Sequence, residues 1–253
     1  MGPSSTALPE LLVISLQRAH DRREFVHRMW GDLGVEPSIL DAVDGATLTD
    51  DDLRRCSPWR AAYHLGRVLT NGEVAVAMSH LAAYRWMLER GLDEVVVLED
   101  DVRASPDFLR VLSERDRLPA DWDVVTLHSL FDWAAPTPIP GVLSAPYSLC
   151  TFERNPMGTQ AYLLRARAAT QLLEVAYPIR FPADELVFRP DPAGLAVYGV
   201  DPSPVVHDEF PSELHAYVSV PSHSGPRELG YAAMGLAGRA GRRLRRRGNG
   251  VRP

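Results

Sequence analysis

Three consecutive carboxylates, Glu99-Asp100-Asp101, directly follow the apolar run Val95–Leu98. A short, continuous apolar run predicts a buried strand of a parallel sheet, and ligands of such sheets bind beyond the carboxyl ends of the strands. Adjacent carboxylates repel one another, and an oxygen-preferring cation such as Mg²⁺ or Mn²⁺ relieves that repulsion. The triplet therefore predicts a metal site with Asp101 as the best ligand and Glu99 as helper; the alternative is a solvated acidic turn.

Strand-like and helix-like segments alternate around this triplet, which predicts an α/β fold with a mostly parallel sheet flanked by helices. Apolar runs predict strands, and amphipathic segments with 3.6-residue spacing predict helices. The predicted strands are 10–16, 38–43, 94–98, 123–127, 159–164 and 196–200, and the predicted helices are 22–33, 71–90, a segment from 105, and 166–176. Residues 46–70 are expected to be irregular with short helical pieces, and the proline-rich residues 131–157 to be a long loop.

Helix boundaries are marked by capping residues. Thr70 and Glu73 have the spacing of a capping box, in which each side chain accepts a hydrogen bond from the other residue's backbone amide. Asp21 is predicted to cap the first helix, with Gly34 as its stop, and Ser105-Pro106 to begin a later helix.

Charge divides the chain into an acidic body and a basic end. The net charge is −6, yet the last 15 residues contain seven arginines, so the remainder carries 20 basic and 33 acidic residues. An acidic body argues against a nucleic-acid partner and suits a protein that concentrates cations. We expect one domain over residues 1–225 and a Gly/Arg-rich tail over 226–253, either disordered or in weak contact with an anionic membrane surface.

Residue usage indicates a reduced intracellular environment. Cys56 and Cys150 are too few for a disulfide framework or a zinc site and are expected to be free thiols. No apolar run has the length of a signal sequence or membrane span, so a cytoplasmic location is expected, with peripheral contact at the inner membrane face as an option. The many Ala, Pro and Arg residues and the absence of Lys suggest a bacterial source.

Six short motifs occur in an order that resembles one enzyme family. They are Val13-Ile-Ser-Leu16 with Asp21-Arg22-Arg23, Asp41-Ala-Val-Asp-Gly45, Leu69-Thr-Asn-Gly-Glu73 with Ser79-His80, Val97-Leu-Glu-Asp-Asp-Val102, Gly158-Thr-Gln-Ala-Tyr162 and Pro182-Ala-Asp-Glu-Leu186. Over roughly residues 10–210 the chain resembles glycosyltransferase family 25, which includes lipopolysaccharide β-galactosyltransferases and collagen galactosyltransferases. Val76 departs from the pattern, because the family often has Cys there.

The resemblance implies a GT-A type fold, which is Rossmann-like, and an inverting transfer of a hexose from a UDP-sugar, often UDP-galactose, with Mn²⁺ or Mg²⁺. The acceptor is left open between a glycan, a lipid-linked sugar, a peptide and a small molecule, in cell-envelope or natural-product biosynthesis. An inverting displacement needs a base on the acceptor hydroxyl and a cation on the departing diphosphate. Asp184 is the predicted catalytic base and Glu185 its rival.

Further residues are candidates for the donor site. His207 follows the last predicted strand and is a third candidate metal or diphosphate ligand. Gly158 and Thr159 would let the backbone approach the donor sugar. The remaining candidates for contacts to the nucleotide, ribose or diphosphate are Ser15, Arg18, Arg22, Arg23, Asp44, Gly45, Ser79, His80 and Asp100. Each has a structural alternative, such as a turn, a helix start or a hydrogen bond in the core.

Two other functions are compatible with acids after a strand. A metal-dependent phosphohydrolase would require a nucleophilic Asp and a downstream Lys, and the chain contains no Lys. A catalytically inactive nucleotide-sugar-binding protein would keep the fold and tolerate loss of Asp184.

Overall fold

The computed structural model describes residues 8–128, 135–189 and 193–207. These residues fall into two compact units. Of the described residues, the first contains 8–43, 78–175 and those between 183 and 207, and the second contains 44–77 and 176–182. The arginine-rich tail and the predicted domain boundary at residue 225 lie outside the described residues, so the predicted domain division stays a prediction.

The first unit contains an eight-stranded sheet within the described part of the chain, in the order β2-β1-β3-β8-β5-β9-β7-β6. The strands are β1 Glu10–Ser15, β2 Ser38–Asp41, β3 Glu94–Glu99, β5 Val124–Thr126, β6 Pro136–Ile139, β7 Ser148–Phe152, β8 Ala161–Arg165 and β9 Val197–Asp201. The pairs β1–β2, β1–β3 and β5–β9 are parallel, while β7 and β8 run antiparallel to their neighbours. Six of these strands therefore share one direction, which confirms the mostly parallel α/β sheet.

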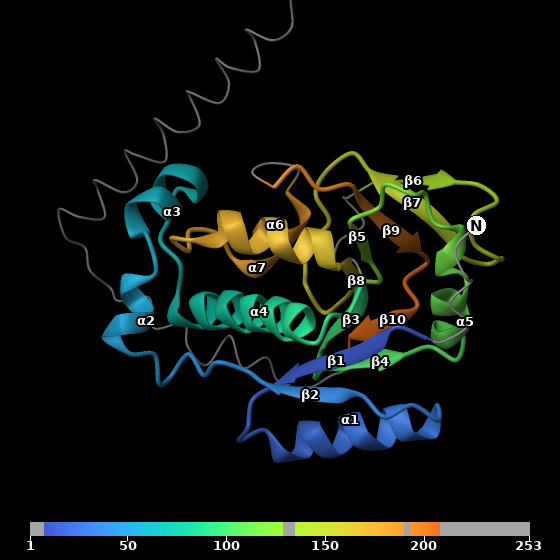
Figure 1. Ribbon diagram of the computed structural model, residues 1–253, viewed down its shortest axis with the longest axis horizontal. Coiled ribbons are helices and arrows are strands. Elements are labelled where there is room, and N and C mark those ends of the chain that lie inside the picture. The colour runs from blue at the N-terminus through green and yellow to red at the C-terminus, as the bar shows by residue number, and fades with distance from the viewer. Residues whose placement is uncertain (1–7, 129–134, 190–192, 208–253) are drawn as a thin grey trace, which may run out of the picture. The chain divides into compact units, whose positions relative to one another are not determined.

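Helices of the first unit cover both faces of this sheet. They are α1 His20–Asp32, α5 Phe108–Ser113, α6 Ala166–Ala176, α7 Ala183–Phe188, the 3₁₀ turn η1 Arg115–Arg117 and most of α4 Asn71–Glu89. Alternate residues of β8 point to opposite faces: Leu163 packs with α1 and α5, and Tyr162 contacts α4. Figure 1 shows α1 and α4 on opposite sides of β1.

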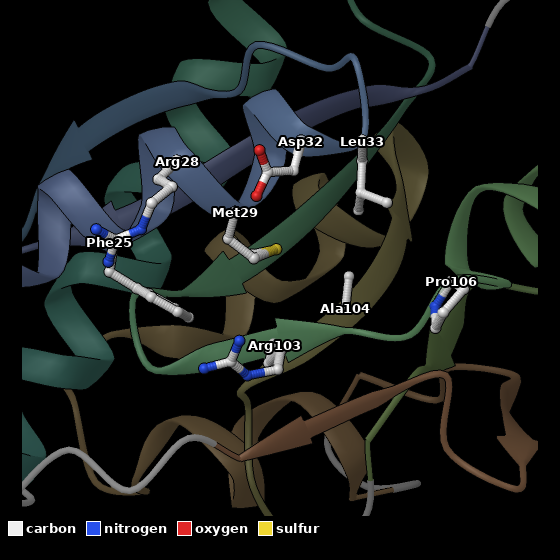
Figure 2. Close-up of a pocket in the computed structure, with 8 residues that line it drawn as sticks. All are labelled: Phe25, Arg28, Met29, Asp32, Leu33, Arg103, Ala104 and Pro106. Carbon is white, nitrogen blue, oxygen red and sulfur yellow. The ribbon is translucent and has the colours of Figure 1, made fainter.

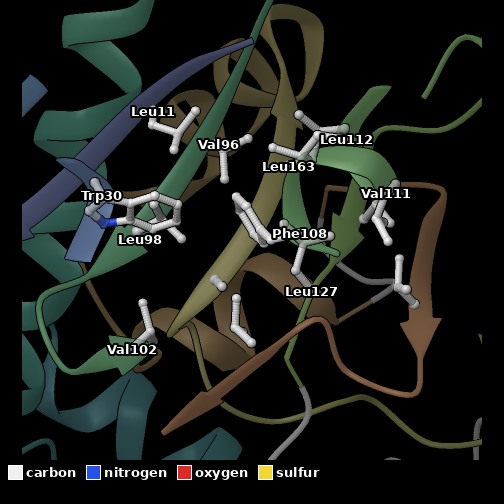
Figure 3. Packing of buried hydrophobic residues seen from close by; sticks show 14 of the residues in the cluster. Leu11, Trp30, Val96, Leu98, Val102, Phe108, Val111, Leu112, Leu127 and Leu163 are labelled. Atoms are coloured by element: carbon white, nitrogen blue, oxygen red, sulfur yellow. The ribbon is translucent and has the colours of Figure 1, made fainter. Parts of the chain in front are cut away.

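The core between α1, α5 and the sheet is built around two aromatic rings. Trp30 and Phe108 are fully buried and meet edge to face, with their ring centroids 5.1 Å apart. Figure 3 shows them among Leu98, Val96 and Leu163 of the central strands. Since buried aromatic rings provide large apolar contacts, this cluster holds β3 rigidly in place.

The second unit contains the helices α2 Asp50–Arg54 and α3 Pro58–Leu65 and the first turns of α4. The predicted capping box of α4 is confirmed: the amide of Thr70 donates to Glu73 at 2.9 Å, and the amide of Glu73 donates to Thr70 Oγ1 at 3.2 Å. No described helix combines the length and the apolar character needed to cross a bilayer.

Three details of the sequence prediction are wrong. Asp21 lies inside the first turn of α1, whose N-cap is Ala19, and α5 begins after Asp107 rather than Ser105. The predicted loop over 131–157 contains the antiparallel pair β6–β7. The exposed, proline-containing β6 lies at the edge of the sheet and lacks the apolar run of a central strand. A separate two-stranded ribbon of β4 Val102–Ala104 and β10 Val205–His207 was not predicted either.

Gly199 in β9 provides a test of the sheet packing. A Cβ atom at this position would lie 2.3 Å from the ring of Phe152 and 3.0 Å from Thr126, so Gly199→Ala forces neighbouring side chains to move. We expect it to lower the free energy of unfolding by about 1–3 kcal/mol in chemical denaturation.

Gly31→Ala is the matched control for Gly199→Ala. A Cβ atom there meets nothing within 4 Å, and Gly31 lies inside α1. Alanine is the better helix former, so this variant should gain about 0.5–1 kcal/mol. Equal stability of the two variants would contradict the described packing of β9.

Candidate active site

The acidic triplet lies where β3 ends, near the middle of the sheet. Glu99 is the last residue of β3, Asp100 and Asp101 form the turn that follows, and β4 begins at Val102. Because β3 is paired with β1 on one side and β8 on the other, the position of the turn is fixed from both sides. Asp100 and Asp101 are both buried, with 7% and 8% of their surface exposed.

Asp100 is bound by the protein itself. Its carboxylate accepts hydrogen bonds from Ser15 Oγ at 2.6 Å and from the guanidinium of Arg22 at 2.6 Å. Arg22 also approaches Asp101 at 3.5 Å. Ser15, Arg22 and Asp100, all predicted to contact the donor, thus contact one another, and Arg22 serves as a counter-ion of the acidic turn. Neighbouring Arg23 binds the backbone of Ser15 and Leu16 instead.

The charged form of Asp101 is disfavoured by its surroundings. Burial and the negative charge of Glu99 raise the pKa of Asp101 to about 7, against partial compensation by Arg22. A carboxyl group whose charged form is disfavoured in this way gains the most from a bound cation. This shift is the physical reason to keep Asp101 as the first candidate metal ligand.

Glu99 is held on the opposite side of the turn. Thr159 Oγ1 donates a hydrogen bond of 2.8 Å to Glu99 Oε1, and Nε2 of His80 lies 3.6 Å from the same oxygen. Thr159 is 4% exposed, and it precedes β8, which runs antiparallel to β3. The structure therefore brings the predicted residues Thr159 and Glu99 together, although they are far apart in sequence.

Asp184 belongs to the same cluster. Its carboxylate accepts from the amide of Glu185 at 2.8 Å and from the amide of Gly158 at 3.5 Å. Burial raises the pKa of Asp184, and the charge of Glu99 adds to this effect. Glu185 instead forms an ion pair with Arg189 at 3.2 Å. Of the two candidate bases, Asp184 is the one coupled to the acidic turn.

The remaining predicted site residues lie in different surroundings. Ser79 and His80 are 2% and 1% exposed, and Ser79 Oγ accepts from the amide of Val43. The backbone of His207 pairs with Val102, immediately after the acidic turn. Asp44 and Gly45 form a turn in the second unit, in which Asp44 Oδ1 accepts from the amide of Ala46. Arg18 is exposed in the turn between β1 and α1.

A cation would have to be shared with the substrate at this site. Within the described residues, no three His, Cys, Asp or Glu side chains are arranged to hold a metal ion. Mg²⁺ commonly takes only one or two protein carboxylates and completes its shell with substrate phosphates and water. With Asp100 engaged by Ser15 and Arg22, the pair Asp101 and Glu99 fits that mode of binding.

A cavity of about 300 Å³ lies elsewhere in the first unit, between α1 and β4. Figure 2 shows Arg28 and Met29 of α1 facing it together with Arg103 and Ala104 of β4. None of the predicted site residues lines it. The chemistry is therefore assigned to the buried acidic cluster and not to this cavity.

Sequence reasoning overlooked two tyrosines behind Glu99. Tyr162 and Tyr84 are fully buried and hydrogen-bonded to each other, and Tyr162 is also bonded to His80. Tyr162 ends one of the six motifs, and Tyr84 lies one helical turn after His80. The spacing of one helical turn between His80 and Tyr84 is the signal that the sequence offers.

Comparison with known proteins assigns the chain to a family. The sequence profile described as "Glycosyltransferase family 25 (LPS biosynthesis protein)" matches residues 8–135, just over half of the 253 residues. The chain therefore belongs to glycosyltransferase family 25.

Two similar proteins differ in what their names say about activity. The chain is 30% identical over 241 residues to the human protein called "Inactive glycosyltransferase 25 family member 3", with 90% of this chain and 36% of the relative covered. It is 28% identical over 239 residues to "Procollagen galactosyltransferase 1-A" of Xenopus laevis, with 90% and 35% covered. The chain thus spans about a third of the length of these relatives.

Solved structures resemble the chain only distantly. One of them is a glycosyltransferase involved in the glycosylation of the major capsid of PBCV-1. The superposition includes 81% of this chain and 95% of that protein, with 9% sequence identity and a TM-score of 0.44. A likeness of this size says nothing further about the chain.

The raised pKa of Asp101 predicts an opposite pH dependence for two Asp→Asn substitutions. In the unfolded chain Asp101 loses its proton near the ordinary pKa of 3.8, whereas in the native state it keeps the proton up to a pH of about 7. Between these two pH values the native state binds more protons, so the free energy of unfolding falls as pH rises from about 4 to about 7. Asp101→Asn replaces the titrating carboxyl group with an amide and so removes this loss of stability. The stability of the variant relative to the parent should increase across that window in urea denaturation with a chelator present.

Asp52→Asn is the control. Hydrogen bonds from Thr49 lower the pKa of Asp52, so its contribution is present above the ordinary value and lost as pH falls below it. The relative stability of this variant should therefore decrease between about pH 3 and neutrality. If the stability relative to the parent changes with pH in the same direction for both variants, the raised pKa assigned to Asp101 is wrong.

Proposed function

We propose that the chain transfers a hexose, with galactose the expected sugar, from a UDP-sugar to an acceptor hydroxyl with inversion, using Mn²⁺ or Mg²⁺. The observation that carries this proposal is the cluster of Glu99, Asp101 and Asp184 at the end of a central strand in a member of family 25. The charge of Glu99 raises the pKa of both Asp101 and Asp184, which supports a site shared by the three carboxylates.

The donor side of the site is assigned to the acidic turn. Asp101 and Glu99 would hold the cation, with His207 as a further candidate. When bound, the cation neutralises charge on the departing diphosphate. Thr159 and Arg22 orient the carboxylates of Glu99 and Asp100, so the turn needs little rearrangement to receive a donor.

The acceptor side is assigned to Asp184. Two backbone amides fix its carboxylate, and its raised pKa brings it closer to neutrality, where a general base is most effective. Gly158, whose amide is one of these donors, has a φ of 90°, a conformation that side chains disfavour. The position therefore suits glycine and leaves the backbone open to a close approach by the sugar.

The acceptor is proposed to be a hydroxyl on a glycan, lipid-linked sugar, peptide or small molecule. The procollagen galactosyltransferase relatives favour including a peptide in the first tests. A cytoplasmic location with weak membrane contact through the arginine-rich tail is also part of the proposal.

A second candidate function is a nucleotide-sugar-binding protein without transfer activity. The similarity to relatives named as inactive favours it. A panel of UDP-hexoses with Mn²⁺ or Mg²⁺ separates the two: the transferase binds a donor and releases UDP with an acceptor, whereas the inactive protein binds without turnover. If no UDP-sugar binds and Asp101→Ala changes nothing, the donor site itself is misassigned.

Asp184→Asn tests the assignment of the base. The side chain keeps its shape and loses its ability to accept a proton, so kcat should fall by about 10²-fold or more. The Kd of the UDP-sugar, measured by calorimetry, should stay within about twofold, because the substitution removes an interaction of the reaction step rather than of binding.

Glu185→Gln is the matched control, since Glu185 lies next in the chain and pairs with Arg189. It should retain most of the transfer activity. Loss of donor binding in Asp184→Asn, or loss of activity in Glu185→Gln alone, would show that the base is misassigned.

A further inference from the structure

Behind Glu99, three buried side chains form a continuous polar chain. His80 Nδ1 lies 2.8 Å from the hydroxyl of Tyr162, and that hydroxyl lies 3.0 Å from the hydroxyl of Tyr84. The other nitrogen of His80, Nε2, lies 3.6 Å from Glu99 Oε1. His80 and Tyr84 come from α4, and Tyr162 comes from β8, the strand next to β3.

The hydrogen bonds among His80, Tyr162 and Tyr84 matter for stability because all three side chains are buried. Both tyrosines are completely buried and His80 is 1% exposed. Polar groups in such surroundings are costly unless every one is hydrogen-bonded, and a satisfied network rigidifies what it contacts. Phenylalanine and an aliphatic residue would fill the same space without this requirement, so the polar groups call for a role beyond packing.

The direction of each hydrogen bond follows from the charge at one end. Burial raises the pKa of both tyrosines, so each stays a phenol with one proton to donate. In one arrangement, Tyr84 donates to Tyr162, Tyr162 donates to His80 Nδ1, and the proton of His80 is on Nε2. In the reverse arrangement, the proton is on Nδ1 and an Nε2 lone pair faces the carboxylate of Glu99.

Glu99 decides between these arrangements. A lone pair facing a carboxylate oxygen is repulsive, whereas an N–H dipole facing it is attractive. At 3.6 Å the contact is too long for a hydrogen bond, so it acts as a charge–dipole interaction. Thr159 holds the same oxygen with a hydrogen bond of 2.8 Å, so the carboxylate is constrained from two directions.

We propose that Tyr84, Tyr162 and His80 form a positioning relay that keeps the His80 proton on Nε2, facing Glu99, and thereby orients the Glu99 carboxylate in the donor site. This inference rests on the proposed function for its consequence in catalysis, but the relay itself is a property of the folded chain. His80 is thus a positioning residue that acts through Glu99.

The relay predicts the tautomer of His80, which ¹⁵N NMR of histidine-labelled protein measures directly. His80→Gln identifies the resonances of His80 among the eight histidines. The parent should show a protonated Nε2 and an unprotonated, hydrogen-bonded Nδ1. A protonated Nδ1 with a bare Nε2 would overturn the proposal, whether or not the protein proves to be a transferase.

Tyr162→Phe should break the relay in its middle. It removes only a hydroxyl, so His80 Nδ1 loses its donor and the NMR signature of the single tautomer should be lost. Tyr84→Phe leaves the bond to His80 in place and should keep the signature. Loss of the Tyr162 hydroxyl without any change at His80 would contradict the relay.

Tyr147→Phe is the matched control for a general effect of removing a buried hydroxyl. Tyr147 is 7% exposed, and its hydroxyl lies 3.2 Å from Ser105 Oγ, outside the relay. We expect Tyr162→Phe to raise the KM for the UDP-sugar or lower kcat about tenfold, and Tyr147→Phe to change both by less than about twofold.

The outcomes separate the relay from the proposed function. Equal kinetic losses in Tyr162→Phe and Tyr147→Phe would reduce the relay to a structural role and overturn the positioning claim. If the parent neither binds nor turns over any UDP-sugar, the proposed function fails, while the NMR tautomer still decides whether the relay exists. Should Tyr162→Phe not fold, the tautomer seen in the parent spectrum still provides that decision.

Discussion

Repulsion among four carboxylates is the constraint on which this site depends. The charges of Glu99 and Asp100 act on Asp101, the charge of Glu99 acts on Asp184, and burial makes the charged forms of Asp101 and Asp184 costly. The chain compensates them unequally. Asp100 has Arg22 and Ser15, Glu99 has Thr159 with His80 beside it, and Asp184 has two backbone amides. Asp101 keeps a raised pKa of about 7 despite the partial compensation by Arg22, which is why it is the proposed cation ligand.

The fold holds the partners of these carboxylates rigidly in place. The partners of the acidic turn come from β1, α1, β8 and α4, elements that pack on β3 from its two edges and its two faces. The apolar cluster around Trp30 and Phe108 holds one face, and the tyrosines hold the other. Since tightly packed interiors resist small displacements, the carboxylates of the turn are fixed more by the core than by one another.

Elements with a strong periodic pattern could be predicted from the sequence, and elements defined by pairing could not. The apolar run before Glu99 and the capping box at Thr70 depend on local sequence, and both are confirmed. The ribbon of β4 and β10 and the edge pair β6–β7 depend on partners distant in the chain. No local pattern encodes such pairing, so these strands were missed or assigned to a loop.

The candidate site also combines residues that the sequence identifies with an environment that depends on distant parts of the chain. The acidic triplet and Asp184 could be found from composition, position and family resemblance. Their environment could not, because it is made by side chains from other elements. Arg22, a candidate for the diphosphate, is paired with Asp100, and His80, a candidate for the nucleotide, is hydrogen-bonded to Tyr162. Alternation along β8 could have placed Tyr162 on the face of α4, had the antiparallel direction of β8 been known.

The reversed direction of β8 has a consequence for how this site can diversify. Because β8 runs against β3, the residues that precede it, Gly158 and Thr159, arrive beside Glu99, and the backbone of Glu99 bonds to Gln160. The connection from β7 into β8 therefore ends beside the acidic turn, which belongs to an independent stretch of chain. If the turn is the proposed donor site, insertions or exchanges in that connection alter the space beside it and leave the proposed cation ligands untouched, so specificity and chemistry can be adjusted separately.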